Sequence, residues 1–356
     1  MNFNSMIVPR VSVIMPAFNA ELYIEETINS ILTQTFHDFE FLIYDDCSSD
    51  RTYEIIKSYS DSRIRVFRNE INIGYVKTLN KLIGLASGEY IARQDNDDIS
   101  LSTRLQEQIS FLDKNLKVGL CGSNVQVFGK KNIISSMPLS DEEIRAFMII
   151  NNPICHPTVM FRKSIFEEFS ISNYDESLCP AEDYNMWFEI SKNTQLANLS
   201  SVLLKYRWHN ENVSQLKKNI QLEMVSRIKA KILFYALSYE ISNEELTLFN
   251  SLETSEVLSM DELYVLENLL LKLIFLNQSV LYYDDYILRN VFFNFWIRTC
   301  KRANEISLRM RLSIMLKSNL FKFKFLFKFL FNRADLKRKL YILQFVYILW
   351  LRRKFL

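Results

Sequence analysis

A cluster of acids directly behind an apolar stretch limits what this chain can fold into. The stretch Tyr90-Ile91-Ala92 is followed at once by Arg93 and by Gln94-Asp95-Asn96-Asp97-Asp98. Unpaired charges are too costly to bury, so these acids must reach water or a cation where the strand ends. Open α/β sheets bind their ligands at the carboxyl ends of their strands. Carboxylates at this density suit Mg²⁺ or Mn²⁺, which usually share their coordination shell with substrate phosphates.

The charge of the chain is unevenly distributed. The length of 356 residues indicates about two domains, and 49% hydrophobic with 24% charged residues is typical of a globular protein. Residues 301–356 contain 15 Lys and Arg but only two acids, whereas the remainder contains 28 basic and 39 acidic residues. A mildly acidic body with a strongly basic tail indicates that the partner is an anionic surface.

The cysteines and the two ends of the chain favour a cytoplasmic location. Five scattered cysteines without a Cys-x-x-Cys pair are typical of free thiols in a reducing compartment. Residues 1–10 lack the apolar segment of a secretory signal. The late apolar run Leu340–Leu351 has about half the length that spans a bilayer, so we expect no spanning segment.

The pattern of the chain changes near residue 215. All Gly and Pro residues lie within the first 180 positions, where runs typical of strands at 11–15, 39–44, 63–67 and 90–94 alternate with helical periods at 21–34, 51–59 and 74–86. This alternation predicts a largely parallel sheet with helices on both faces. Residues from about 218 to 315 show apolar and charged positions at helical periods, and Ser242 and Ser259 are the predicted helix starts. We therefore predict an α/β domain over 1–217 that binds the substrates and a helical region over 218–356.

The last segment, about 316–356, combines aromatic rings with positive charge. Phe occupies every odd position from 321 to 331, and Arg352-Arg353-Lys354 closes the chain. The alternation has a strand period but its neighbours look helical, so the sequence does not decide its conformation. One interpretation is an apolar core face with solvated lysines. We favour contact with the headgroups of an anionic leaflet, because so few acids balance the charge. The lysines alternate with apolar rings instead of forming a polar basic face, so we do not expect nucleic acid as a partner.

Polar groups follow three of the predicted strands. They are Pro16-Ala17-Phe18-Asn19, Asp45-Asp46 and Asp95-Asn96-Asp97-Asp98. In a parallel sheet all three lie at one edge, where they suit a nucleoside diphosphate. Phe18 could lie against a base, Asp46 could accept from a base N–H, Asp95 could accept from the ribose and Asp97 could hold a metal.

The order and spacing of these motifs over about residues 10–215 resemble the family 2 inverting glycosyltransferases with the GT-A (Rossmann-like) fold. The motifs are Val-Ser-Val-Ile-Met-Pro-Ala-Phe-Asn (11–19), Tyr-Asp-Asp-Cys-Ser-Ser-Asp-Arg-Thr (44–52), Asn-Ile-Gly (72–74), Ala-Ser-Gly-Glu-Tyr-Ile (86–91) and Arg-Gln-Asp-Asn-Asp-Asp (93–98). The resemblance implies that the nucleotide sugar binds Pro16, Ala17, Phe18, Asn19, Asp46, Asp95 and Asn96, and that Asp97 binds Mn²⁺ or Mg²⁺.

A second part of the resemblance is the acid pair in Pro180-Ala181-Glu182-Asp183-Tyr184-Asn185-Met186-Trp187. Two acids in a first helical turn also stabilise the helix dipole, which is the structural alternative. A sugar hydroxyl is a poor nucleophile until its proton is accepted, so the reaction needs a base. The resemblance implies that Asp183 is this base and that Glu182 positions the acceptor.

Two histidines and one tryptophan complete the predicted site. His209 stands where the family often places a histidine near the metal, although a capping or surface role is equally compatible with the sequence. His156 and Trp187 fall on the acceptor side by the same resemblance. A histidine before a proline can also simply order a turn.

Two departures from the family pattern refine the prediction. The processive members carry Gln-x-x-Arg-Trp, but here Leu204 stands where the Gln would be before Arg207-Trp208, which favours one sugar per event. Leu79 stands where a basic residue is common, so contacts to the diphosphate would come from Lys77, Lys81 or Arg93.

We therefore expect a metal-dependent inverting hexosyltransferase of bacterial surface-glycan synthesis, such as lipopolysaccharide or capsule. It would move one sugar from a nucleotide-diphosphate sugar, UDP favoured, to a glycan or lipid-linked saccharide, peripherally on the inner face of the cell membrane. A sugar-phosphate nucleotidyltransferase is the alternative enzyme, but the loop Pro16-Ala17-Phe18-Asn19-Ala20 lacks the Gly and Lys that would hold a triphosphate. An inactive membrane-attached binding module is the third hypothesis, and it predicts a damaged acid set.

Overall fold

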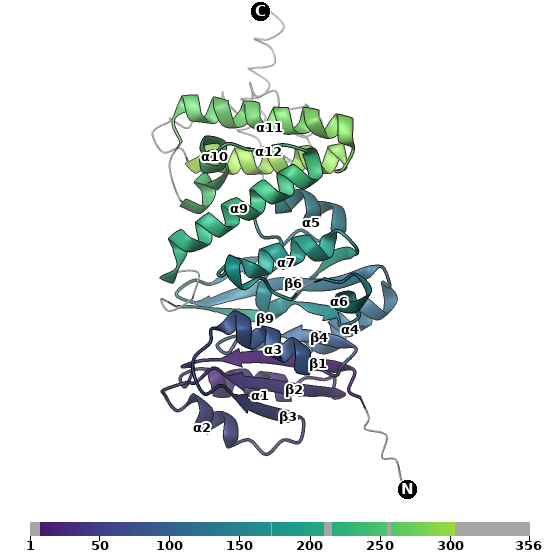
Figure 1. Cartoon of the computed structure of the whole chain (residues 1–356), viewed down its shortest axis with the longest axis vertical. Helices are drawn as coiled ribbons and strands as arrows, with labels where there is room; N and C mark the ends of the chain where they lie inside the picture. Colours follow the sequence, from purple (N-terminus) through teal and green to yellow (C-terminus); the bar gives the residue numbers. More distant parts are fainter. Residues whose placement is uncertain (1–7, 172, 210–215, 255–257, 303–356) are drawn as a thin grey trace, which may run out of the picture. The chain divides into compact units, whose positions relative to one another are not determined.

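The computed structural model describes residues 8–171, 173–209, 216–254 and 258–302 (Figure 1). The chain divides into two compact units, Met1–Ile232 and Leu233–Leu356. The division falls inside helix α9 (Lys218–Leu237), whereas the sequence predicts a boundary just before that helix. The basic aromatic tail at 316–356 lies outside the described residues.

The first unit is built on one mixed sheet. Its strand order is β3-β2-β1-β4-β8-β6-β9-β5, and β7 pairs with β6. The strands are β1 (Val11–Ala17), β2 (Phe39–Asp45), β3 (Ile64–Arg68), β4 (Tyr90–Arg93), β5 (Ile99–Ser100), β6 (Val118–Gly129), β7 (Ile133–Ser135), β8 (Met160–Arg162) and β9 (Gln195–Trp208). Among these strands, β1, β2, β3, β4, β6 and β9 run in one direction, and β5, β7 and β8 run against them. The predicted, mostly parallel sheet is confirmed.

Helices cover both faces of the central strands. Val11, Val13 and Met15 of β1 point to the face covered by α1 (Ile24–Leu32), α2 (Thr52–Lys57) and α4 (Arg104–Lys114). Because side chains alternate along a strand, the next residues point to the other face, where α3 (Tyr75–Leu85) packs on β1 and β2. Helix α1 buries Ile24, Ile28 and Ile31, which is the helical spacing that its sequence predicts.

Pro16 lies inside β1, although the sequence predicts that it ends the strand. The pairing of β1 with β4 ends where Ile14 faces Arg93, and only the pairing with β2 continues to Ala17. On the β4 side, therefore, the missing N–H of Pro16 removes no hydrogen bond from the ladder. The strand reaches two residues further toward the functional edge than the sequence predicts.

Shorter elements frame the second half of this unit. They are α5 (Asp141–Met148), η1 (His156–Thr158), α6 (Ile165–Glu168), η2 (Glu176–Leu178) and α7 (Glu182–Ser191). Helix α7 begins with the predicted acid pair, and α5 begins with a capping box on Ser140.

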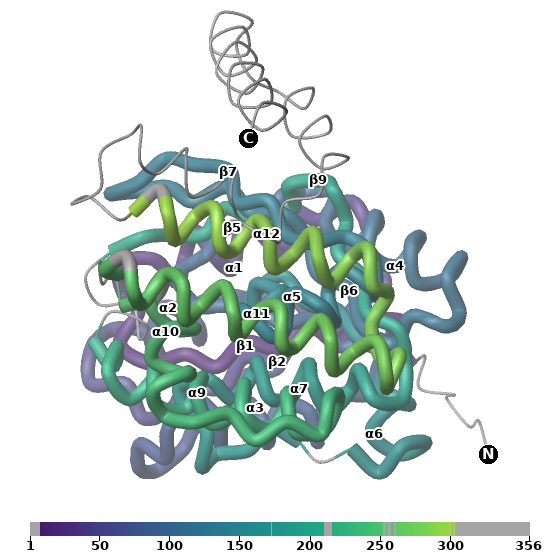
Figure 2. The backbone as a smooth tube through the Cα atoms, turned by 90° about the horizontal axis from the view of Figure 1, so that it is seen from above, coloured from purple at the N-terminus to yellow at the C-terminus, as the bar shows by residue number. Residues whose placement is uncertain are grey.

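The described part of the second unit is helical, as predicted. Its remaining helices are α10 (Asn243–Thr254), α11 (Met260–Val280) and α12 (Asp285–Arg302), and Figures 1 and 2 show α11 and α12 side by side. Capping hydrogen bonds between Ser242 and Glu245 and between Ser259 and Glu262 confirm both predicted helix starts. Within the described residues, the stretch Asp261–Val280 alone has the length and composition to cross a membrane, and 44% of it is buried inside the protein.

Candidate active site

The ends of β1, β2 and β4 meet at one edge of the sheet. Asn96, in the acidic loop after β4, donates from Nδ2 to the carbonyl of Phe18 at 3.5 Å. Asn19 has a φ of 46° and accepts from the backbone N–H of Ser49 at 2.9 Å, which joins the ends of β1 and β2. Phe18 is 43% exposed, so its ring is available to a ligand. The structure thus brings together the three polar segments that the sequence singled out.

Asp46 supports the loop that leads into α3. It is 2% exposed, and its carboxylate accepts from Asn69 Nδ2 at 2.8 Å, from the Ile73 N–H at 3.0 Å and from the Gly74 N–H at 2.9 Å. Gly74 has a φ of 91°, a conformation that side chains rarely adopt. Asp46 therefore has a structural part in shaping the edge, and its contact with a base stays a prediction.

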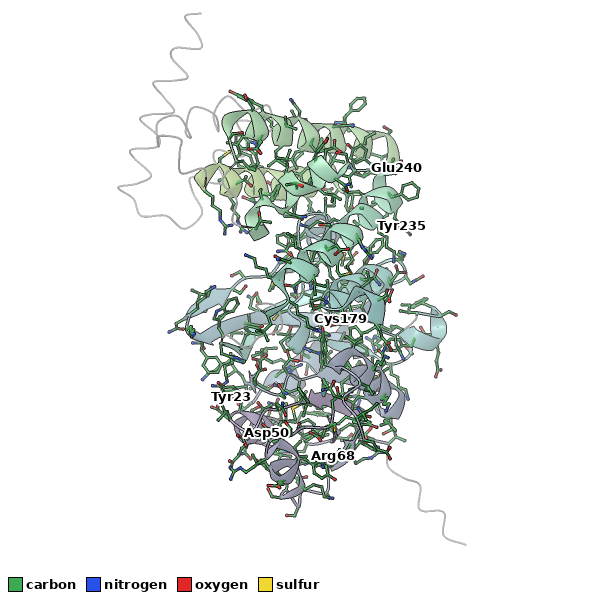
Figure 3. The ribbon with its side chains drawn as sticks, turned by 60° about the vertical axis from the view of Figure 1, so that its left-hand side comes forward. Tyr23, Asp50, Arg68, Cys179, Tyr235 and Glu240 are labelled. Carbon is green, nitrogen blue, oxygen red and sulfur yellow. The ribbon has the colours of Figure 1, made fainter. Side chains whose placement is uncertain are left out.

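The acidic loop is fastened by the end of β9. Asp97 Oδ2 lies 2.8 Å from His209 Nε2. The backbone N–H of Arg207 donates to Asp98 Oδ1 at 2.7 Å, and its Nε donates to the Asp97 carbonyl at 2.8 Å. The ring of His209 packs at 5.3 Å from that of Tyr23, which Figure 3 labels. His209 thus lies beside Asp97, and its contact with a metal stays a prediction.

The acids of this loop fit a divalent cation. Ligand atoms of Asp95, Asp97 and Asp98 lie within 4.8 Å of one another. Asp98 is fully buried, and its Oδ2 has no hydrogen-bond partner among the described residues. Burial and the neighbouring carboxylates raise the pKa of Asp97 and Asp98. An orphaned buried carboxylate oxygen in a cluster of hard ligands is what Mg²⁺ or Mn²⁺ would satisfy.

A buried network beneath the loop holds its backbone. Arg104 is fully buried and donates to Gln94 Oε1 at 3.0 Å, to Ser100 Oγ at 2.9 Å and to the Arg93 carbonyl at 2.7 Å. Gln94 in turn donates at 3.0 Å to the carbonyls of Asp95 and Asp98. Burial lowers the pKa of Arg104 to about 10.

The acid pair at the start of α7 occupies two different surroundings. The side chain of Glu182 is 1% exposed, and both its oxygens lie 2.8 Å from the Tyr75 hydroxyl. That of Asp183 is 15% exposed and accepts from Asn152 Nδ2 at 2.8 Å and from the Tyr184 N–H at 2.7 Å. Burial raises the pKa of Glu182 to about 7 and that of Asp183 to about 6. Of the two, Asp183 is the carboxylate that a substrate can reach.

Aromatic residues surround the acid pair. His156 Nε2 lies 3.0 Å from the Tyr174 hydroxyl, and its Nδ1 lies 3.9 Å from Glu182 Oε1 and 3.8 Å from Asp183 Oδ2. Trp187 is fully buried and stands edge-on to His156 at 5.6 Å. His156 therefore borders the acid pair, whereas Trp187 lies behind it and reaches the acceptor side only through His156.

Comparison with known proteins identifies the family. The model of glycosyl transferase family 2 matches residues 12–170. An uncharacterized glycosyltransferase of Haemophilus influenzae is 32% identical over 267 residues, which cover 71% of this chain and 82% of that protein. This chain belongs to glycosyl transferase family 2.

Two further likenesses concern a named enzyme and the fold. The Escherichia coli UDP-Glc:alpha-D-GlcNAc-diphosphoundecaprenol beta-1,3-glucosyltransferase WfgD is 32% identical over 209 residues, which cover 58% of this chain and 80% of that enzyme. The crystal structure of S. aureus TarS 1–349 in complex with UDP-GlcNAc aligns with a TM-score of 0.57 at 21% identity, over 83% of this chain and 92% of that one. The fold of this glycosyltransferase is therefore GT-A, as the sequence predicted.

The three basic residues predicted near the diphosphate differ in availability. Lys77 is exposed and lies 3.6 Å from Glu176, and Lys81 donates to Asn69 Oδ1 at 2.7 Å. Arg93 is buried, pairs with Asp95 at 2.5 Å and leaves Nε and Nη1 without a hydrogen-bond partner among the described residues. Arg93 is thus the one of the three that belongs to the acid cluster.

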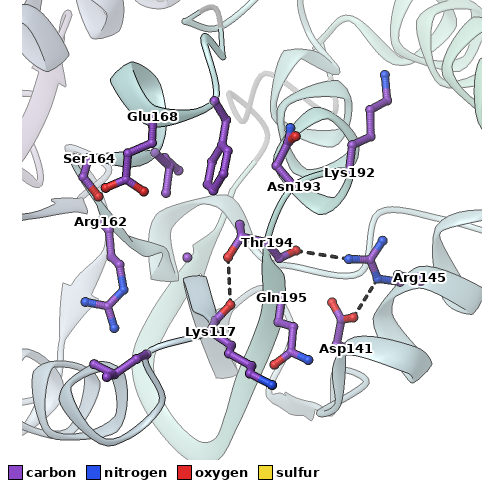
Figure 4. Close-up of a pocket in the computed structure, with 14 residues that line it drawn as sticks. Lys117, Asp141, Arg145, Arg162, Ser164, Glu168, Lys192, Asn193, Thr194 and Gln195 are labelled. Atoms are coloured by element: carbon purple, nitrogen blue, oxygen red, sulfur yellow. Dashed lines mark hydrogen bonds and ion pairs between the residues drawn. The ribbon is translucent and has the colours of Figure 1, made fainter.

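A separate cavity of about 470 Å³ lies elsewhere in the glycosyltransferase (Figure 4). Its lining includes Lys117 and Gly119 at the start of β6, Arg162 at the end of β8 and Gln195 at the start of β9. Arg162 pairs with Tyr90 at the start of β4, whereas the acids follow the end of β4. The cavity is therefore at the opposite edge of the sheet and shares no lining residue with the candidate active site.

Proposed function

We propose that this glycosyltransferase moves one sugar from a UDP-sugar to a saccharide acceptor with inversion at the anomeric carbon. The observation that carries the proposal is the series of short contacts that connects the acidic loop after β4 to the acid pair at the start of α7. Arg93 pairs with Asp95 at 2.5 Å and donates its backbone N–H to the carbonyl of Val159, which follows η1, and His156 of η1 lies 3.8 Å from Asp183 Oδ2. These contacts support a single site that holds donor and acceptor together, as a single displacement requires.

Asp183 is the proposed base. It accepts the proton of the acceptor hydroxyl as that oxygen bonds to the anomeric carbon, while the bond from this carbon to the diphosphate breaks. A single displacement of this kind inverts the configuration. Asn152 and the Tyr184 N–H hold the Asp183 carboxylate in place. Because Glu182 is almost fully buried against Tyr75, we place it behind Asp183 and not in direct contact with the acceptor.

The donor would lie across the ends of β1, β2 and β4. In this arrangement Phe18 faces the base, Asp46 and Asp95 face the nucleoside, and Pro16, Ala17, Asn19 and Asn96 line the rest. Asp97 and His209, with Asp95 and Asp98 beside them, would hold Mg²⁺ or Mn²⁺, which supplies positive charge to the leaving diphosphate. Uridine is favoured because the similar enzyme WfgD is named for UDP-Glc and the TarS structure contains UDP-GlcNAc.

The acceptor is proposed to be lipid-linked. The name of WfgD specifies a saccharide on diphosphoundecaprenol as its acceptor. An enzyme that acts on such a substrate must work at a membrane, and the basic aromatic tail of this chain suits the anionic inner leaflet. We therefore propose a peripheral enzyme of surface-polysaccharide synthesis at the inner face of the cell membrane.

The test is turnover of a panel of UDP-, GDP-, CDP- and dTDP-sugars with lipid-linked saccharide acceptors and Mn²⁺ or Mg²⁺. We expect release of UDP and a product with inverted configuration by NMR. Asp183→Asn should lower kcat by about 10²–10⁴-fold, the usual contribution of a general base. Glu189→Gln, on the same helix but paired with Lys192 and Lys231, is the matched control. Release of pyrophosphate, or equal activity of Asp183→Asn and wild type, would refute the proposal.

A further inference from the structure

His156 faces a hydroxyl on one side and two carboxylates on the other. Its Nε2 is 3.0 Å from the Tyr174 hydroxyl, and its Nδ1 is 3.8 Å from Asp183 Oδ2 and 3.9 Å from Glu182 Oε1. The side chain is 11% exposed. Burial and the charge of Arg93 hold the pKa of His156 well below its ordinary value, so the ring is neutral at physiological pH. A neutral imidazole carries one proton, on one of its two nitrogens.

The surroundings of the ring select the nitrogen that carries the proton. A proton on Nε2 would leave the lone pair of Nδ1 facing two carboxylates, which is repulsive once either is ionised. A proton on Nδ1 faces those carboxylates favourably, and the Tyr174 hydroxyl then donates to Nε2. With either carboxylate ionised, only the second arrangement satisfies both sides of the ring.

We propose that Tyr174 fixes His156 as the tautomer protonated on Nδ1, and that this N–H is a positioning group which keeps Asp183 ionised and aimed at the acceptor. The inference rests on the proposed role of Asp183 as the base. The present separation of 3.8 Å is longer than a hydrogen bond. Catalytic hydrogen bonds are often long without substrate and shorten when it binds.

The frame around the ring keeps Tyr174 in position. Asn80 of α3 donates from Nδ2 to the Tyr174 carbonyl at 2.9 Å and accepts from its N–H at 3.0 Å. The rings of Tyr174 and His156 are tilted to one another, and each stands edge-on to the buried ring of Trp187. A residue from another part of the chain thus fixes the hydroxyl that in turn fixes the imidazole.

Other ionisable groups lie near the acid pair, but each either bonds another residue or is held neutral. Tyr75 from α3 is bonded to Glu182, and Arg93 from β4 is paired with Asp95. Two thiols, Cys155 before η1 and Cys179 before α7, are held neutral because burial raises their pKa. Among the described residues, His156 therefore offers Asp183 an N–H that none of these groups supplies.

The tautomer can be observed without any substrate. The chain has three histidines, His37, His156 and His209, so long-range ¹H–¹⁵N spectra of the full-length labelled protein show three imidazoles. Substitution of each assigns them. We expect a protonated Nδ1 and an unprotonated Nε2 for His156 at pH 7, and loss of this preference in Tyr174→Phe. A proton on Nε2 in the wild type would overturn the inference.

The same spectra test a competing use of these groups. Ligand atoms of His156, Glu182 and Asp183 lie within 4.8 Å of one another, a set that could hold a cation. A cation bound there would need the lone pair of Nδ1 and would displace its proton. If the inference is right, Mg²⁺ at millimolar concentration leaves the Nδ1 proton of His156 in place. Loss of that proton on addition of Mg²⁺ would overturn the inference in favour of a cation site.

Paired variants separate a positioning role from a merely structural one. The amide nitrogen of His156→Asn lies near the position of Nδ1, and that of His156→Gln lies near Nε2. We expect His156→Asn to retain most of kcat, and His156→Gln to lose about 10–100-fold, as for other groups that tune a base.

Tyr174→Phe should move the acidic limb of the kcat/KM profile upward by about one pH unit, because the carboxylate loses a favourable N–H.

Tyr59→Phe is the control, since Tyr59 bonds Glu25 and Asn29 outside the site. Its pH profile should match the wild type, and melting temperatures verify that every variant is folded. If the wild type turns over no sugar while His156 shows the Nδ1 tautomer, the proposed function fails and the tautomer stands. If turnover is robust and His156→Gln and Tyr174→Phe both keep the wild-type profile, the positioning role is refuted.

Discussion

Glu182 and Asp183 are adjacent in sequence, yet their carboxylates have different surroundings. Glu182 turns inward to the Tyr75 hydroxyl, whereas Asp183 stays partly open and is held by Asn152. Burial raises the pKa of both groups above the ordinary value of a carboxyl group. The partly open carboxylate is suited to take a proton, and the buried one is suited to tune it.

The raised pKa values predict how the acid pair affects stability. The folded state holds the Glu182 proton more tightly than the unfolded chain, with a pKa of about 7 against an ordinary 4.5. The group therefore stabilises the fold below about pH 4.5 and loses this contribution as the pH rises through 7. We expect Glu182→Gln to raise the melting temperature by a few degrees at pH 8, with no gain at pH 4.5.

The control for this prediction is on the same helix. Although Glu189 is partly buried, Lys192 and Lys231 keep its pKa below the ordinary value. Glu189→Gln should therefore lower the melting temperature at pH 8. Equal shifts of the two variants in the same direction would contradict the assigned surroundings.

The acidic loop predicts a cation-dependent stability. A cation that binds only the folded state raises its melting temperature in proportion to the logarithm of the cation concentration. We expect Mn²⁺ and Mg²⁺ to stabilise the wild type, EDTA to reverse this, and Asp97→Asn to abolish it. Asp113→Asn, which removes a carboxylate paired with Arg10 on the surface, should keep the full effect. A cation effect that survives Asp97→Asn would place the metal elsewhere.

The motifs allowed the acids to be predicted, but not the groups that support them. Asp46, Asp95, Asp97 and Asp183 stand in short segments with a recognisable order. The partners of the acid pair do not: Tyr75 is 107 positions from Glu182, and Asn152 is 31 from Asp183. A tyrosine or asparagine at these positions carries no local signal, because only the folded chain brings α3 and the segment before η1 to the start of α7.

At the scale of elements, the end of β9 is the part that sequence patterns described least well. Arg207 lies between the rings of Tyr23 at 4.6 Å and Phe128 at 4.5 Å while it bonds the acidic loop. The sequence marked Arg207 only as part of an incomplete processivity signature. Its role depends on three elements that meet at the sheet edge, which no single window of sequence contains.

Helices and strands of the first hundred residues followed from periodicity, with ends that differ by a few residues. Helix α1 spans Ile24–Leu32 where 21–34 was expected. The parallel pairing of the long strands β6 and β9 was not predicted, because its register shifts near Ser123 and Asn124 disturb any alternation. Pairing between distant strands depends on the whole sheet and not on local propensity.

Two nearby glycines give a test of this packing. A Cβ on Gly88 would lie 2.6 Å from the backbone nitrogen of Ser12, whereas one on Gly84 in α3 would meet nothing within 4 Å. Gly88→Ala should therefore lower the free energy of unfolding by roughly 2 kcal/mol or more, since the obstacle is backbone. Gly84→Ala should raise it by about 0.5–1 kcal/mol through helix propensity. Urea unfolding measures both, and a stabilising Gly88→Ala would contradict the close approach of the β1 backbone.

At the scale of the whole molecule, charge separates the tail from the rest. The last 56 residues carry 15 of the 43 basic residues and two of the 41 acidic ones. Each basic residue near an anionic leaflet contributes about 1 kcal/mol to the free energy of membrane binding. This asymmetry can be read from the sequence, whereas the donor, acceptor and linkage depend on pocket shape that it does not display.

The tail predicts binding of the full-length protein to anionic vesicles. Replacing Lys322, Lys324 and Lys328 by Glu should weaken sedimentation with phosphatidylglycerol vesicles by at least about 100-fold, while neutral vesicles bind neither protein. The same change at exposed Lys57, Lys114 and Lys117 is the control and should have little effect. Equal losses in the two triple variants would show that net charge, and not the tail, governs the association.

The buried network under the acidic loop has a thermodynamic consequence. Gln94 donates to the backbone carbonyls of Asp95 and Asp98, and Ser100 and Arg104 in turn donate to the Gln94 amide oxygen. A cation that binds this loop therefore meets a backbone that is already fixed, and binding need not order a flexible segment. Calorimetry of cation uptake should accordingly show the heat of ligand exchange and water release, with little of the unfavourable entropy that ordering a loop would add.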